Sequence, residues 1–210
     1  NTVVVFTSDN GALIREGGGS NGPLRAAKGT TWEGGQRVPC IVRWPGRVSA
    51  GRIIEDVVNA MDLYPTIAGW CEVDVPDDRT LDGRDLGSLL YGGDGPDEAP
   101  FFYMLGGNVE AVRLGRWKLH VRKWNEERVR LYDLVHDIGE RHDLVDEHPE
   151  VVAELLTLIS AARSEFGDDA SEIAGSGVRP VGRVSDPITL TTFDEDAPYY
   201  MAEYDLPERG

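Results

Sequence analysis

The stretch TVVVFTSDNG at residues 2–11 decides the fold class, because it joins an apolar run directly to a polar turn. Residues 2–7 are β-branched or aromatic and do not alternate with polar residues, which is typical of a strand buried on both faces in a parallel sheet. Turn-forming residues at 8–11 then break the strand. Functional groups of open α/β sheets gather at such carboxyl ends of strands. The stretch therefore predicts an α/β fold with a candidate site in this turn.

The next segments extend the same pattern. Residues 11–36 are rich in glycine and show little periodicity, which predicts a long loop with a functional role. The apolar run at 38–44 predicts a second buried strand. Apolar residues recur at helical spacing over 55–72, so we expect a helix there that is interrupted near Pro65 or starts a turn before it, with Asn59 or Asp62 as the candidate cap. Residues 1–72 should thus add two strands and a helix to a mixed, mainly parallel α/β sheet.

The second half of the chain has a different pattern. Four strand-like segments follow one another, and in the third of them apolar and polar residues alternate, as expected of a half-exposed antiparallel strand. A helix with one apolar face is predicted from Pro149, a residue suited to a first turn, to Phe166. The four strand-like segments are 101–103, 110–113, 117–122 and 129–134.

These patterns divide the chain into four regions. Residues 1–72 form part of an α/β domain, and residues 73–100, rich in Asp, Gly and Pro, form a linker. Residues 101–166 form a small α+β domain, with an antiparallel sheet and one packed helix. Residues 167–210 are acidic and weakly patterned, which predicts an extended tail.

Charge and cysteine content exclude several classes of protein. The 210 residues carry a formal net charge of −16, which argues against nucleic acid as a partner and against a polybasic membrane anchor. Hydrophobic residues make up 40%, so the chain has enough apolar material for a core. Cys40 and Cys71 are too few for a disulfide scaffold, and their apolar neighbours favour two buried free thiols. The cellular location stays open.

Two weak signals could carry chemistry. Asp9 and Asn10 offer hard oxygen donors on adjacent residues, which suit Ca²⁺ or Mg²⁺, but calcium takes about six to eight oxygens and the string is also a common turn. Lys28, in KGTTWEGG, could neutralise an oxyanion or could be a solvated surface lysine. Ala27 replaces the glycine that a phosphate-binding loop needs before its lysine. Histidine spacing does not indicate zinc, and no serine-hydrolase elbow occurs.

Taken in order, four strings resemble the carboxyl-terminal part of a type I, arylsulfatase-like sulfatase of the alkaline-phosphatase-like superfamily. The second string is the most specific, and the resemblance covers about residues 1–166. The strings are TVVVFTSDNG at 2–11, NGPLRAAKGTTWEGGQRVPCIVRWPGR at 21–47, VNAMDLYPTIA at 58–68 with LDGRDLGSLL at 81–90, and AVRLGRWKLHVR at 111–122 with LYDLVHDIGERHDLVDEHPEVVAELL at 131–156.

The resemblance implies a site and a reaction. In this family a divalent cation, usually calcium, lies beside a formylglycine, and Asp9 and Asn10 carry over as its two late ligands. Lys28 carries over as the sulfate-binding lysine, so the implied function is hydrolysis of sulfate monoesters of a small molecule or sugar. The neighbouring cations Arg25 and Arg37 are expected to be structural, because arginines near strand ends often tie carboxylates or carbonyls.

Other parts of the family pattern are missing. Neither cysteine stands in the formylglycine signature Cys/Ser-x-Pro/Ala-x-Arg, since Cys40 precedes Ile-Val-Arg and Cys71 precedes Glu-Val-Asp. We therefore expect the nucleophile and the upstream half of the catalytic domain to lie outside this sequence, and the chain alone to be inactive. Two alternatives stay open: a phosphonate or phosphate monoester hydrolase of the same superfamily, and an inactive binding fragment.

Overall fold

A computed structural model describes residues 2–124, 126–183 and 185. The described residues as far as Gly177 belong to one compact unit, and those from Val178 onward belong to a second. The two units are described separately. Most of the acidic tail predicted at 167–210 lies outside the described residues. Its first part makes a β-bridge between Asp168 and Ile173.

Four antiparallel strands form the larger sheet, in the order in which they occur in the chain. Glycines with positive φ, Gly106 at 59° and Gly115 at 55°, make the two tight turns possible, because side chains other than glycine rarely adopt that conformation. The prediction of an antiparallel sheet over 101–134 is confirmed. The strands are β3 (Phe101–Leu105), β4 (Asn108–Leu114), β5 (Trp117–Lys123) and β6 (Glu126–Asp133).

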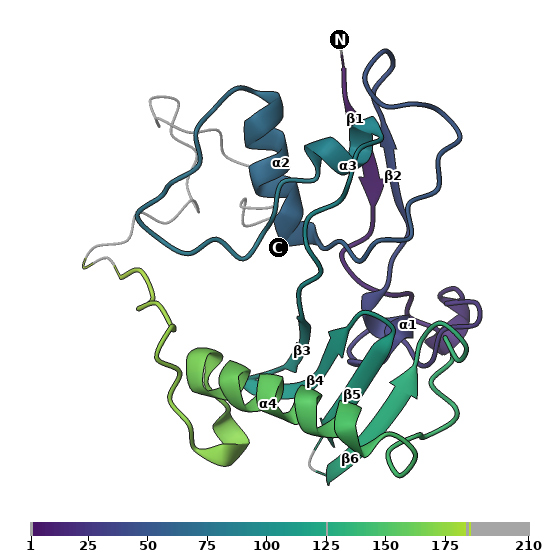
Figure 1. Cartoon of the computed structure of the whole chain (residues 1–210), viewed down its shortest axis with the longest axis vertical. Coiled ribbons are helices and arrows are strands. Elements are labelled where there is room, and N and C mark those ends of the chain that lie inside the picture. The colour runs from purple at the N-terminus through teal and green to yellow at the C-terminus, as the bar shows by residue number, and fades with distance from the viewer. Residues whose placement is uncertain (1, 125, 184, 186–210) are drawn as a thin grey trace, which may run out of the picture. The chain divides into compact units, whose positions relative to one another are not determined.

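Helix α4 (Pro149–Phe166) covers one face of this sheet, which we call the helix face (Figure 1). The helix has the predicted bounds, with Pro149 in its first turn. Its apolar stripe packs on apolar residues of β4, β5 and β6, and so excludes water from a continuous core. The buried members of this core are Val109, Val112, Leu119, Val121, Leu131, Leu155, Ile159 and Ala162.

The opposite face, which we call the loop face, is covered by the glycine-rich segment and by the short helix α1 (Glu33–Gln36). Here the prediction of a half-exposed strand at 117–122 is wrong, since Lys118 and His120 have no exposed surface. Alternation did place these polar side chains on one face. That face is buried because carboxylates from outside the sheet lie against it, as the site geometry below shows.

The first two strands also differ from the prediction. β1 (Val4–Thr7) and β2 (Cys40–Arg43) pair antiparallel, and among the described residues they pair only with each other. Phe6 and Ile41 are 61% and 60% exposed, so the expected burial in a mainly parallel sheet is wrong for this chain. A non-alternating apolar run suits a strand that is covered on both faces, but in the described part of the chain no further strand flanks this pair.

The helix predicted within 55–72 starts at Leu63, shortly before Pro65, in agreement with the start expected about a turn before this proline. A 3-10 turn at Ala60–Asp62 leads into α2 (Leu63–Trp70), and Asn59 caps the turn by accepting a 2.8 Å hydrogen bond from the amide of Met61. The region predicted as a linker contains α3 (Gly87–Tyr91). Its buried leucines pack against Trp70 and Val42.

Both cysteines are free, as predicted, but neither is buried. Cys40 lies on the exposed β2 and Cys71 follows the last residue of α2, so apolar sequence neighbours did not make either position interior. Within the described residues, none of the helices combines the length and the apolar character that crossing a membrane requires. The described fold is a mixed α/β arrangement with antiparallel sheets and few helices.

Candidate site on the glycine-rich loop

The turn after β1 is joined to the glycine-rich loop through the backbone. The amide of Gly11 donates to the carbonyl of Gly35 over 3.0 Å, and the amide of Lys28 donates to the carbonyl of Ala12 over 3.2 Å. These two bonds tie Lys28 and Gly35, in the second half of the loop, to the two residues that directly follow Asp9 and Asn10. The structure therefore brings the two segments that carry the predicted site residues together at the backbone.

Close approach of the two segments depends on residues without side chains. A Cβ atom on Gly11 would lie 1.8 Å from the carbonyl oxygen of Gly34, and one on Gly34 would lie 2.4 Å from the carbonyl oxygen of Arg25. Real Cβ atoms do not approach backbone oxygens so closely. Glycine is thus required at both positions for packing, whatever backbone angles the residues adopt.

Asn21 holds the middle of the loop. Its side-chain oxygen accepts a 2.7 Å hydrogen bond from the amide of Ala12, and its Nδ2 donates to the carbonyl of Ala26 over 2.9 Å. Sequence reasoning gave this residue no role. An Asn inside a glycine-rich segment is a weak signal, because such side chains commonly bond to nearby backbone.

The predicted metal ligands lie at the surface of this framework. Asp9 is exposed and Asn10 is half-buried, and the hydroxyl of Ser8 donates to the Asn10 carbonyl over 2.9 Å. Two hard oxygen donors on adjacent residues fit part of a calcium shell. Among the described residues, no three His, Cys, Asp or Glu side chains gather in a way that could complete a metal site. The donor set therefore fits a hard cation as a partial shell.

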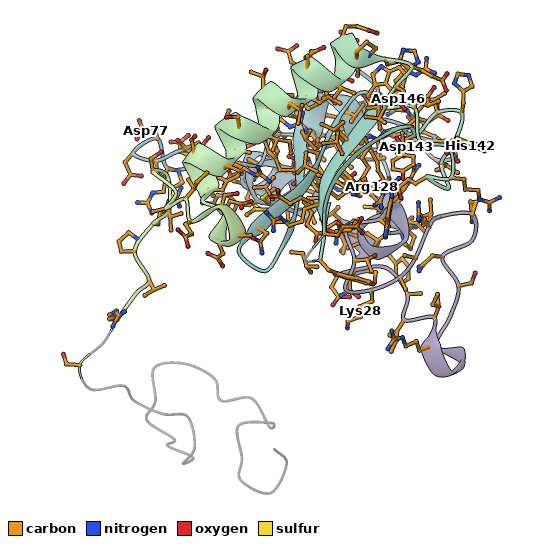
Figure 2. The ribbon with its side chains drawn as sticks, turned by 90° about the horizontal axis from the view of Figure 1, so that it is seen from below. Lys28, Asp77, Arg128, His142, Asp143 and Asp146 are labelled. Carbon is orange, nitrogen blue, oxygen red and sulfur yellow. The ribbon has the colours of Figure 1, made fainter. Side chains whose placement is uncertain are left out.

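Lys28 lies on the side of the four-stranded sheet away from α4, with its side chain pointing outward (Figure 2). The other two lysines of the chain are held by carboxylates. Lys118 pairs with Glu33 at 2.8 Å and with Glu140 at 3.0 Å, and Lys123 pairs with Glu110 at 3.4 Å. In the described part of the chain, Lys28 has no ion pair and is exposed. Its ammonium group is thus open to a ligand.

A buried polar cluster anchors the loop to the sheet. Glu33 accepts from Lys118 and from the hydroxyl of Tyr103, both over 2.8 Å, while its own amide donates to Glu140 over 2.8 Å. Lys118 also donates to the carbonyl of Thr31 over 2.9 Å. Burial, with the Glu33 charge as a second cause, raises the pKa of Tyr103 well above its usual value and keeps the phenol a donor. The cluster fixes the backbone just beyond Lys28.

Aromatic rings pack beside this cluster. Trp32 lies 4.3 Å from the ring of His120, centroid to centroid, and the guanidinium of Arg25 lies 3.7 Å from the Trp32 centroid. Arg25 also donates to the carbonyl of Glu140. This is the kind of structural role predicted for Arg25, because a backbone carbonyl and a ring together occupy its guanidinium.

A second polar group fixes the neighbouring residue of the loop. The hydroxyl of Thr31 donates to buried Glu110, and Lys123 donates to the same hydroxyl. Burial lowers the pKa of Lys123 from 10.5 to about 8, although the nearby Glu110 carboxylate opposes the change. Sequence reasoning missed both polar groups. The one available signal was the alternation that placed Lys118 and His120 on one face.

Comparisons with known proteins point to one family. The family described as "Sulfatase" matches residues 1–73. The mouse steryl-sulfatase is 36% identical over 198 residues, which cover 77% of this chain and 32% of that protein. The dog N-acetylgalactosamine-6-sulfatase is 45% identical over 127 residues, which cover 59% of this chain and 24% of that protein. The chain thus spans about a quarter to a third of these curated relatives.

Solved structures give the same result for the fold. The crystal structure titled Ps i-CgsB superposes with a TM-score of 0.70 at 30% sequence identity, over 84% of this chain and 39% of that one. A second structure of that protein is titled as a complex with k-i-k-neocarrahexaose. A third, titled PsFucS1 sulfatase from Pseudoalteromonas sp., superposes with a TM-score of 0.67 at 24% identity, over 78% of this chain and 37% of that one.

Proposed function

Because the chain belongs to the sulfatase family and matches the carboxyl-terminal portion of its relatives, we propose that it serves in the hydrolysis of sulfate monoesters. One observation carries the proposal. The turn of Asp9 and Asn10 and the loop of Lys28 are clamped together at the backbone, and Lys28 is exposed while the other lysines are held by carboxylates. The relatives named above are sulfatases, which favours sulfate over phosphate esters.

Lys28 has an electrostatic role in this proposal. A sulfate monoester carries one negative charge, and further charge develops on the leaving oxygen in the transition state. An ammonium group beside that charge stabilises it without a proton transfer. The clamp between the loop and the β1 turn limits how far the lysine backbone can move, so its side chain is positioned before the substrate arrives.

Asp9 and Asn10 would hold part of a divalent cation, calcium or magnesium, through their side-chain oxygens. The cation supplies Lewis-acid polarisation of the sulfate when it is bound. The exposed carboxylate of Asp9 contributes the negative charge that attracts the ion, and the short turn keeps Asn10 next to it. The remaining ligands and the formylglycine belong, in this proposal, to the longer protein.

The substrate class follows from the relatives. The names of two curated relatives refer to a sterol and to an amino sugar, and the structure of one neighbour is titled as a complex with k-i-k-neocarrahexaose. We propose a sulfated sugar or a comparable small sulfate ester as the substrate. The acidic surface, with a net charge of −16, makes the local cations of the loop stand out as the place for an anion.

Lys28→Ala in the longer protein tests the proposal. Loss of one well-placed electrostatic contact costs about 10²–10³ in rate, so kcat/KM for p-nitrophenyl sulfate should fall by that factor. The melting temperature should stay unchanged, because Lys28 is exposed. Arg37→Ala, at an exposed position close to the same loop, is the matched control and should retain activity. Full activity of Lys28→Ala, with loss of activity in a folded Arg25→Ala or Arg37→Ala, would contradict the assignment.

Calcium binding and turnover of the isolated chain test the rest. The 210-residue chain should bind calcium weakly in calorimetry, because two ligands leave most of the shell to water. It should not hydrolyse p-nitrophenyl sulfate above a buffer blank. In the longer protein, Asp9→Asn should raise the calcium concentration needed for half-maximal activity. Tight calcium binding by the chain alone, or unchanged calcium dependence of Asp9→Asn, would contradict the partial-shell assignment.

A further inference from the structure

A pocket of about 610 Å³ opens beside the turn between β5 and β6. Its lining combines cations with aromatic rings: Arg25, Lys123 and Arg130 contribute positive charge, and Trp32 and Trp124 contribute indole surface. Thr30 and one carboxylate, that of Glu126, complete it. Lys123 is paired with Glu110, so the positive charge of the pocket comes from Arg25 and Arg130 against the one carboxylate of Glu126, in a chain whose net charge is −16. Such a lining suits an anionic ligand that also has an apolar surface.

Two of the three cations are already fixed in place. Arg25 stacks on Trp32, with 3.7 Å between its guanidinium carbon and the ring centroid, and the Lys123 ammonium lies 4.3 Å from the same ring. Arg130 differs, because it is half-buried and has no ion pair among the described residues. A half-buried guanidinium without a protein carboxylate can bind an anion in bidentate fashion.

Trp124 is the unusual residue of the pocket. Its side chain is 70% exposed, and its backbone has a φ of 53°, a region that bulky residues rarely adopt. Its amide donates a 2.9 Å hydrogen bond to the Oε1 atom of Glu110, which is 2% exposed. A buried carboxylate thus maintains a strained turn that presents an indole ring to solvent. Strain of this kind is often found at binding sites.

The pocket lies next to the proposed sulfate-binding lysine. Thr30 lines it and is fixed by a 2.8 Å hydrogen bond from its hydroxyl to the carbonyl of Ala27. Lys28 lies between these two residues in the chain, and Cα atoms two residues apart are separated by at most about 7 Å. The backbone of Lys28 therefore lies close to a residue that lines the pocket.

We infer that the pocket binds the sugar unit next to the hydrolysed ester, with Arg130 contacting a second sulfate group and Trp124 stacking on the apolar face of the ring. This inference rests on the proposed sulfatase function and narrows its substrate class to sulfated oligosaccharides. The flat indole suits the C–H face of a pyranose, and the guanidinium suits the planar pairing of two sulfate oxygens.

Binding to the 210-residue chain tests the inference directly. The probe is a sulfated carrageenan hexasaccharide, with its desulfated counterpart as the ligand control, followed by calorimetry and tryptophan fluorescence. Because Arg130→Gln removes a charge-assisted hydrogen bond to the sulfate group, it should weaken binding about tenfold or more. Trp124→Ala should also weaken it and reduce the fluorescence change, of which Trp32 in the same lining can supply the remainder. The desulfated probe should bind as weakly to wild type as the sulfated probe binds to Arg130→Gln.

Arg128→Gln is the matched control variant. Arg128 is also on β6 and exposed, but it lines a different cavity together with Leu156 and Ile159 of α4 (Figure 2). The substitution Arg128→Gln removes the same charge, but from the helix face. It should leave the affinity for the probe within about twofold of that of wild type. Equal weakening by Arg128→Gln and Arg130→Gln would overturn the inference, because it would show general attraction instead of a site.

The longer protein separates this inference from the proposed function. There, Arg130→Gln should raise KM for the hexasaccharide more than it lowers kcat, whereas Lys28→Ala should lower kcat. If Lys28→Ala lowers kcat but Arg130→Gln and Trp124→Ala bind and turn over the hexasaccharide like wild type, the pocket is wrong and the sulfatase proposal stands. If the pocket variants lose binding while Lys28→Ala keeps full activity, the lysine assignment is wrong and the pocket stands.

Discussion

The two faces of the four-stranded sheet are both buried, but α4 and the glycine-rich loop are bound to them by different interactions. On the helix face, side chains such as Leu119 and Leu131 belong with Leu155 of α4 to one core of apolar side chains. On the loop face, Lys118 and His120, which flank Leu119 in β5, meet carboxylates from the loop and from the segment after β6. Successive residues of β5 thus point alternately into an apolar core and into a cluster of buried ion pairs.

The difference lies in how precisely each cover is positioned. Apolar contact is roughly proportional to buried area and has no preferred direction, so α4 can shift a little without losing much. Hydrogen bonds and ion pairs require defined distances and angles, and a missing partner leaves a buried charge uncompensated. The face that carries the proposed site is the one fixed by directional contacts. The carboxylate of Glu33, for example, accepts hydrogen bonds from both Lys118 and Tyr103.

Lys118→Met should have the largest effect on the free energy of unfolding, and it removes contacts on the loop face only. The substitution leaves Glu33 and Glu140 buried without their shared cation, which typically costs about 3–5 kcal/mol. Urea unfolding should show this loss, and limited proteolysis should cut within 11–36 faster than in wild type. Adding Glu33→Gln should restore part of the stability, because the amide removes one of the two buried charges and leaves only that of Glu140. A loss below about 1 kcal/mol would show that the cluster does not anchor the loop.

Leu155→Ala makes the matching change on the helix face. Leu155 is 1% exposed, and removing its side chain should leave a cavity that costs about 3 kcal/mol. Urea unfolding should again report the loss, but proteolysis within the glycine-rich loop should be unchanged while the sheet stays folded. If Leu155→Ala accelerates cleavage of the loop as much as Lys118→Met does, the two covers are not independent and the comparison fails.

Much of the helix face could be predicted from the sequence, and most of the loop face could not. Alternation in β5 and the apolar stripe of α4 are local patterns, and both elements appear where they were expected. The partners of Lys118 come from Glu33 and Glu140, 85 residues before it and 22 after it, and local periodicity carries no information about such pairs. The sequence could show only that β5 has one polar face.

The candidate site falls between these cases. Asp9, Asn10 and Lys28 were chosen on a turn string, a lysine in a flexible loop and a family resemblance, and their roles stay predictions. What the residues did not reveal is the contact between Gly11 and Gly34, which joins the two segments. The strands flanking this site were expected to be buried, but Phe6 is 61% exposed. An apolar run predicts that a strand is covered on both faces, but it does not show which segment covers it.

Gly11→Ala tests whether the clamp positions the site. The new methyl group would meet the carbonyl oxygen of Gly34 at 1.8 Å, so the segments must separate and the bond to Gly35 must break. Overpacking of this kind costs about 1–3 kcal/mol. Activity of the longer protein should fall further than stability does, since both Lys28 and Asp9 shift. Gly22→Ala, where a Cβ meets nothing within 4 Å but φ is 58°, controls for glycine strain alone and should leave activity much higher.

The smallest expected effect concerns His120 and appears as a dependence on pH. Burial, followed by the charge of Lys118, lowers the pKa of His120 well below 6.5. The ring is then neutral, and it lies 3.0 Å from Glu140 through Nε2, while Nδ1 has no partner in the part of the chain that the structure describes. We therefore expect the proton to lie on Nε2, where it can be donated to the carboxylate.

The sign of the pH effect follows from linkage. In the unfolded chain His120 takes up a proton near pH 6.5, whereas in the folded chain it does not, so protonation favours unfolding. This contribution should be constant above about pH 6.5, and stability should fall as the pH drops below that value. His120→Gln keeps a donor for Glu140 but cannot titrate. The free energy of unfolding of wild type minus that of His120→Gln, measured in urea from pH 7.5 to 5.0, should therefore decrease as the pH falls. Other titrating groups are common to both proteins and cancel in this difference. A difference that stays constant, or grows at low pH, would mean that the loop face accommodates a charged imidazole. The positions of its polar contacts would then not depend on a neutral His120.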